Sequence, residues 1–65
     1  MNIVAQIAYD CRSRARWVRE QTAQGIPLDD LQLQSARNLA YNAYRWDFDS
    51  ASTELSEAIA ENQTL

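Results

Sequence analysis

The sequence predicts an all-α fold: a helical hairpin of two longer helices with a shorter third helix packed against it. Helix-favouring residues dominate the 65 positions, and the only glycine and only proline lie close together at 25 and 27. Apolar residues recur at spacings of three and four, which is the period of one helical face. Capping signals mark the breaks between helices. A chain of this length forms at most one domain, residues 1–65.

The first helix is expected over about residues 2–24. Its apolar stripe consists of Val4, Ile7, Ala8, Cys11, Ala15, Val18 and Thr22. Gly25 supplies the left-handed residue that commonly closes a helix, Ile26 can fold back onto the last turn, and Pro27 prevents continuation. The first helix therefore has a well-marked end.

The second helix is expected over about residues 30–46. Asp29 is a good N-cap, and Gln32 stands three residues later, as a capping box requires. Leu28 and Leu33 flank this start at the spacing of a hydrophobic staple. The expected inner stripe is Leu33, Ala36, Ala40, Ala43 and Tyr44, with Leu39 and Trp46 widening one flank.

The third helix is expected over about residues 50–61, with Asp49 as its cap and Phe48 beneath its first turn. Its apolar face is Ala51, Leu55, Ala58 and Ile59. Residues 62–65 are expected to form a frayed tail. The alternative is that the second helix runs on with only a kink, because the sequence at 47–50 contains no strong helix breaker. We favour separate helices.

The small size and the alanine-rich stripes predict a thin core. A chain this short buries only about 60% of its unfolded surface, and the single cysteine, Cys11, excludes an internal disulfide. Without histidine, a zinc site is not expected either, so no cofactor or metal is predicted. A homodimer is the favoured source of further buried surface. The lack of a signal peptide, of a long apolar segment and of paired cysteines predicts a cytoplasmic protein that does not enter membranes.

The segment 39–51, with the sequence LAYNAYRWDFDSA, resembles the middle of a tetratricopeptide repeat. Leu39, Ala40 and Tyr44 would lie in the first helix of the repeat, and the second helix would follow an Asp-Phe-Asp turn. The resemblance covers less than half of the chain, and the turn is one residue short and lacks the usual glycine. It implies a packed helix pair and a protein-binding role. Because about three repeats are needed to bury the apolar faces of such an array, we interpret the pattern as a generic helix pair.

Catalysis is not expected from this composition. Histidine and lysine, the usual proton-transfer and Schiff-base residues, are both missing. Cys11 lies on the apolar stripe and is interpreted as a small core residue, although nearby arginines could lower a thiol pKa. Glu54, Glu57 and Glu61 share one helical face, which is interpreted as a solvated surface rather than as acid/base groups or metal ligands. The sequence therefore predicts a protein that is not an enzyme.

Arginine and aromatic residues outside the apolar stripes are the candidate partner-binding residues. They are Tyr9, Arg12, Arg16, Trp17, Arg19, Arg37, Tyr41, Arg45 and Trp46. Trp17 lies well off its stripe, so a dimer or another partner is expected to cover it, whereas the third helix is expected to cover Trp46. The alternative for the arginines is pairing with acids, either within a helix, as in Asp10–Arg14 and Arg16–Glu20, or with the third helix.

These features predict a small protein-interaction module that binds and modulates or inhibits another protein. Its size and net charge of −3 are typical of phage-encoded inhibitors or regulators, such as anti-CRISPR-like or anti-host factors. The alternative is a nucleic-acid-binding regulator that uses the arginine and tyrosine residues. A variant is an acidic nucleic-acid mimic, because residues 47–65 carry five acids and no basic residue.

Overall fold

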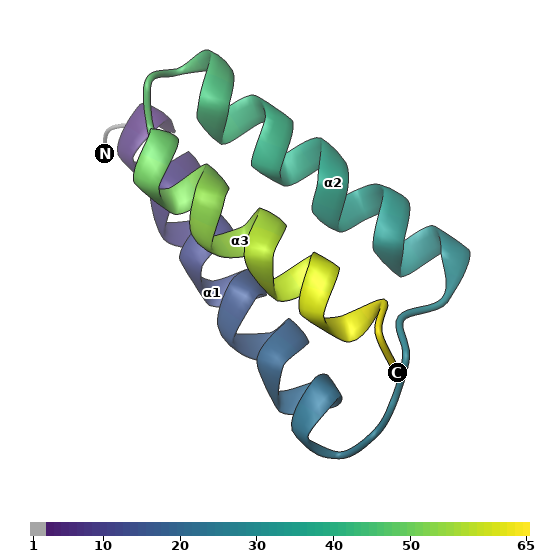
Figure 1. Ribbon diagram of the computed structural model, residues 1–65. Coiled ribbons are helices and arrows are strands. Elements are labelled where there is room, and N and C mark those ends of the chain that lie inside the picture. The colour runs from purple at the N-terminus through teal and green to yellow at the C-terminus, as the bar shows by residue number, and fades with distance from the viewer. Residues whose placement is uncertain (1–2) are drawn as a thin grey trace.

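The computed structural model describes residues 3–65, and every secondary-structure element of this part is a helix. Helix α1 spans Ile3–Ala23, α2 spans Asp30–Arg45 and α3 spans Asp49–Asn62. The third helix lies along both α1 and α2, and each of these two packs more closely against α3 than against the other (Figure 1). The all-α prediction of two longer helices and a shorter third one is confirmed. None of the helices in residues 3–65 combines the length and apolar character needed to cross a membrane.

The end of α1 follows the prediction. Gly25 has φ +74, the left-handed conformation that glycine adopts without steric cost. Its N–H donates to the carbonyl of Thr22 over 2.9 Å, and the N–H of Ile26 donates to the carbonyl of Gln21 over 2.9 Å. This pair of bonds is a Schellman motif, which satisfies carbonyl groups that the end of a helix leaves free.

The start of α2 carries the expected capping box. The N–H of Gln32 donates to the Asp29 carboxylate over 2.8 Å, and the N–H of Asp29 donates to the Gln32 side-chain oxygen over 3.1 Å. Leu28 and Leu33, the expected staple pair, both lie half-buried against the core. The connection from α1 to α2 is thus fixed at both ends by local hydrogen bonds.

The connection from α2 to α3 is a second Schellman motif, and the two helices are separate. Asp47 takes the left-handed position with φ 65, and the N–H of Phe48 donates to the carbonyl of Ala43 over 2.8 Å. The prediction that Asp49 caps α3 is wrong: Phe48 is the N-cap, without a side-chain hydrogen bond, and Asp49 is the first helical residue. Because Asp47 already turns the chain, the carbonyl of Phe48 can accept the first helical bond, from Ser52.

The core is rich in alanine, as expected. Its buried apolar residues are Ala8, Cys11, Ala15, Val18, Ala36, Ala40, Ala43, Ala51, Leu55, Ala58 and Ile59. Phe48 packs against this cluster, as predicted. Tyr44, which was predicted to belong to the inner stripe, is instead 63% exposed. Its position on α2 faces the side of α3 where the side chains are small, so nothing bulky covers it.

Residue 62 departs from the expected frayed tail. Asn62 is the last residue of α3 and is only 1% exposed. Its side-chain oxygen accepts the N–H of Leu28, and its side-chain nitrogen donates to the hydroxyl of Thr22 and to the carbonyl of Ile26. These bonds join the end of α3 to the α1–α2 connection, where the C-terminus also lies in Figure 1.

Candidate functional site

The nine candidate residues do not form one surface. Arg12 and Arg19 lie on the flank where α1 meets α3, and Trp17 lies between α1 and α2. Arg37 and Tyr41 belong to α2 and face α3 across the groove on the other flank of α3. The remaining four residues are exposed elsewhere, and they are Tyr9, Arg16, Arg45 and Trp46. The candidate residues therefore lie in several separate surroundings.

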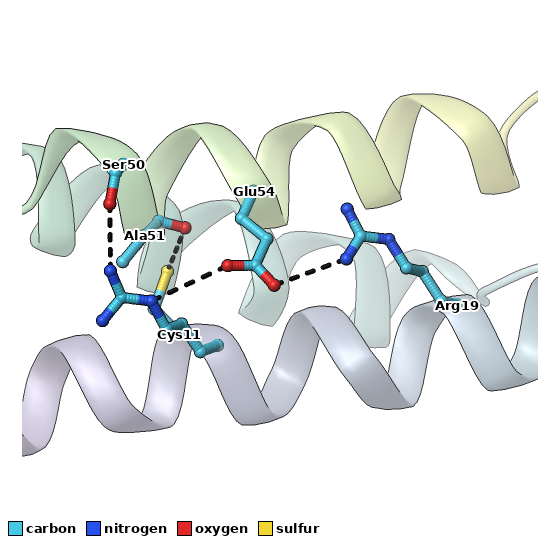
Figure 2. Close-up of polar contacts among 6 residues, drawn as sticks. Cys11, Arg19, Ser50, Ala51 and Glu54 are labelled. Atoms are coloured by element: carbon cyan, nitrogen blue, oxygen red, sulfur yellow. Dashed lines mark hydrogen bonds and ion pairs between the residues drawn. The ribbon is translucent and has the colours of Figure 1, made fainter.

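On the α1–α3 flank, Glu54 lies between two arginines (Figure 2). Its carboxylate is 3.7 Å from Nε of Arg12 and 3.4 Å from Nη1 of Arg19. Arg12 also donates to the hydroxyl of Ser50 over 2.9 Å. The alternative interpretation, in which the third helix pairs with arginines of the first, holds for these two residues. The predicted pairs Asp10–Arg14 and Arg16–Glu20 are not among the ion pairs of residues 3–65.

Cys11 has the surroundings of a core residue. It is fully buried, and its thiol donates to the carbonyl of Ala51 over 3.2 Å. Burial raises the pKa of the Cys11 thiol, the charge of Glu54 raises it further, and Arg12 opposes these effects. The raised pKa keeps the thiol protonated, which is the opposite of what a nucleophilic cysteine requires.

Trp17 is covered in part by its own chain. It is half-buried against the core, and the guanidinium of Arg14 lies 5.7 Å from its ring centroid. Arg14 also donates to the hydroxyl of Ser35 on α2, over 3.4 Å. This cation–π contact was not foreseen, although Arg14 stands three residues before Trp17, at a spacing that places two side chains on one helical face. The need for a partner to cover Trp17 is therefore smaller than the sequence suggested.

Trp46 was expected to be covered by α3, and this expectation is wrong. Trp46 is the C-cap of α2 and is 56% exposed. The turn at Asp47 carries α3 along the alanine stripe of α2, and Phe48 supplies the aromatic ring that packs against the core there. Trp46 is left outside this contact.

The open feature on the remaining flank is a groove of about 550 Å³ between α2 and α3, which we call the aromatic groove. It is lined by Arg37, Ala40, Tyr41, Tyr44, Ser52, Ser56, Ile59, Ala60 and Gln63. Tyr41 and Tyr44 are 55% and 63% exposed. Ala40, Ser52 and Ile59 are buried. Small and apolar side chains thus lie beside two exposed tyrosines.

The sequence identified only part of this groove. It singled out Arg37 and Tyr41 but assigned Tyr44 to the core. A signal was present in the α3 sequence: Ser52, Ser56 and Ala60 recur every four residues and form a row of small side chains. Such a row cannot cover a tyrosine on the neighbouring helix.

No protein-family model matches this chain, and no curated protein or solved structure is detectably similar to it. The tetratricopeptide resemblance therefore has no support beyond the packed α2–α3 pair itself.

Proposed function

We propose that this protein binds another protein through the aromatic groove and thereby modulates that protein. The observation that supports the proposal is the pair of exposed tyrosines, Tyr41 and Tyr44, beside Arg37 and above small and apolar side chains. Tyrosine and arginine are enriched among the residues that dominate binding energy at protein interfaces. Exposed aromatic side chains gathered around a groove are typical of interaction sites on small soluble proteins.

Binding of nucleic acid is the weaker alternative. Glu54 partly neutralises Arg12 and Arg19, which that function would need for phosphate contacts. Domains that bind nucleic acid electrostatically are usually strongly basic, whereas this chain has a net charge of −3. A mobility shift with DNA or RNA at low salt that weakens after Arg12→Ala or Arg37→Ala would favour this alternative.

We expect the bound protein to be modulated or inhibited by the binding itself, because we propose no catalytic residues for this chain. A regulator or inhibitor of the kind that phages encode fits the small size and acidic charge of the sequence. The homodimer predicted from the thin core stays a prediction, and analytical ultracentrifugation over a range of concentrations tests it.

Site-specific photo-crosslinking tests the proposed function. A benzophenone amino acid is placed at position 44 in the groove and, as a matched control, at Tyr9, which is also an exposed tyrosine but lies on α1. We expect a heterologous protein adduct of one defined mass from position 44 and none from position 9. An excess of unlabelled protein should compete for the adduct, and the Tyr41→Ala variant should compete poorly. Absence of the adduct, or equal adducts from both positions, would overturn the proposal.

A further inference from the structure

We infer that the aromatic groove takes an amphipathic α-helix of the partner, which presents aliphatic side chains to the groove and a carboxylate to Arg37. This inference rests on the proposed function and deepens it, because it names the chemistry of the partner segment. Three features carry the inference: the shape of the groove, its charge, and the position of the acids of α3.

The shape of the groove suits a helix. Two neighbouring helices form a trough between them, and the groove residues on α3 and its C-cap extend from Ser52 to Gln63. At a rise of 1.5 Å per residue this stretch is roughly 17 Å long, enough for the anchors at i, i+3 or i+4 and i+7 that a docked helix uses. Ser56 and Ala60, the exposed members of the small-residue row, let another helix approach closely, whereas Ser52 is buried and donates to the carbonyl of Ala40. Since about 150 Å³ holds one benzene ring, a groove of about 550 Å³ has room for roughly three inserted side chains.

The charge of the groove favours an acidic partner. Arg12 and Arg19 each lie within 4 Å of the Glu54 carboxylate. Arg37 instead donates to the neutral side-chain oxygen of Gln63 over 3.3 Å, and no ion pair of residues 3–65 includes it. The groove therefore carries an arginine without a carboxylate, although the chain as a whole is acidic. A partner carboxylate is the charge that complements this site.

The same charge distribution disfavours a second copy of this chain as the occupant. A closed dimer built on the groove would be symmetric, so each groove would face an identical groove that lacks carboxylates. Glu54 lies on the opposite flank of α3, and Glu57 and Glu61 follow it at spacings of three and seven residues, which keep them on the Glu54 side. A contact between Arg37 and these acids of another copy would be heterologous and would not close into a dimer.

Two synthetic peptides provide the probes. Both form an amphipathic helix with leucine at the i, i+4 and i+7 anchor positions, and one carries glutamates beside the leucine row where the other carries lysines. Binding to the full-length protein is measured by fluorescence anisotropy. We expect the glutamate peptide to bind at least about fivefold more tightly than the lysine peptide, with a smaller difference at high salt because exposed charges are screened. The Arg37→Glu variant should reverse this preference.

Two further variants separate groove binding from nonspecific adhesion. Tyr44→Ala should weaken the glutamate peptide about tenfold, whereas Tyr9→Ala, an equally drastic truncation of an exposed tyrosine on α1, should leave its affinity unchanged. Equal binding of the two peptides, no binding of either, or an unchanged affinity after Tyr44→Ala would overturn the inference. A stable homodimer that dissociates on Tyr44→Ala would also overturn it, because the occupant would then be a second copy. A photo-adduct at position 44 without discrimination between the peptides would refute the acidic helix and leave the proposed function standing.

Discussion

Replacing Asn62 by alanine should lower the free energy of unfolding by about 2 kcal/mol. The side chain is 1% exposed and makes three hydrogen bonds, to the N–H of Leu28, the hydroxyl of Thr22 and the carbonyl of Ile26, at 2.9, 3.0 and 3.0 Å. A hydrogen bond contributes about 1 kcal/mol net, and a buried group left without its partner costs about 1–3 kcal/mol. Water can reach the exposed Ile26, and the hydroxyl of Thr22 retains its bond to the carbonyl of Val18. The loss of unfolding free energy therefore stays below the cost of three buried groups without partners.

The loss is large relative to the stability of such a chain. At about 0.05 kcal/mol per residue, the lower end of the usual range, 65 residues give roughly 3 kcal/mol. Urea unfolding followed by circular dichroism measures the change. For a small protein the free energy of unfolding falls with a slope of about 1 kcal/mol per molar urea, so the urea concentration at the midpoint of unfolding should fall by roughly 2 M. The slope itself should not change, because the alanine variant buries the same elements.

Two further variants serve as controls for Asn62→Ala. Gln63→Ala, next in the chain but exposed, should change stability by less than about 0.5 kcal/mol. Asn62→Asp keeps an acceptor for the N–H of Leu28 but faces the carbonyl of Ile26 with a second oxygen, so at neutral pH it should destabilise at least as much as alanine. Acidification should recover part of that loss, because a protonated carboxyl can donate one bond. An Asn62→Ala variant within about 0.5 kcal/mol of the wild type would refute the reasoning and show that apolar packing alone fixes the end of α3.

Three further outcomes are expected. Thiol reagents should label Cys11 far more slowly in the folded protein than in urea, and equal labelling rates would contradict its burial. Since burial and Glu54 raise the pKa of the folded thiol, the free energy of unfolding should also fall as pH rises above the pKa of the unfolded thiol. Asp47→Gly should raise the melting temperature, with a gain of about 0.5–1 kcal/mol, because the left-handed φ of 65 suits glycine; a lower melting temperature would mean that the aspartate side chain is needed. Glu54→Gln removes ion pairs with Arg12 and Arg19 that are more than a third exposed, so it should cost less than about 1 kcal/mol and the cost should fade in concentrated salt; a loss that salt leaves unchanged would contradict this.

The ends of the helices near residues 24–32 could be predicted because they depend on neighbouring residues. The positive φ of Gly25 and the reciprocal bonds of Asp29 and Gln32 involve groups no more than a few positions apart, so their spacing in the sequence is sufficient information. The turn between α2 and α3 was harder to predict. Both Asp47 and Asp49 are reasonable terminal residues, and the choice of Asp47 as the left-handed residue moved the start of α3 one position earlier.

The binding surfaces could be predicted only in part. Whether a residue beside the apolar stripe of α2 is buried depends on the direction in which α3 crosses it, and α3 follows later in the chain. The stripe of Ala36, Ala40 and Ala43 is buried as expected, but helical spacing alone does not reveal which neighbouring position a third helix will cover. Tyr44 and Trp46 were therefore assigned to the wrong surroundings. The bonds of Asn62 are equally non-local, since its Thr22 partner is 40 residues away in the chain.

The asymmetry of α3 links the folded structure to the candidate site. Toward α1, α3 presents Glu54, whose carboxylate bridges two arginines and closes that flank with polar contacts. Toward α2, it presents the row of Ser52, Ser56 and Ala60, whose short side chains cannot reach across to Tyr41 and Tyr44. Both patterns lie on the same 14-residue helix, so α3 forms ion pairs on the α1 flank and leaves the tyrosines uncovered on the α2 flank. Because this flank also holds Arg37, which makes no ion pair within residues 3–65, an unpaired positive charge and the uncovered aromatic surface lie together, and a single partner segment can contact both.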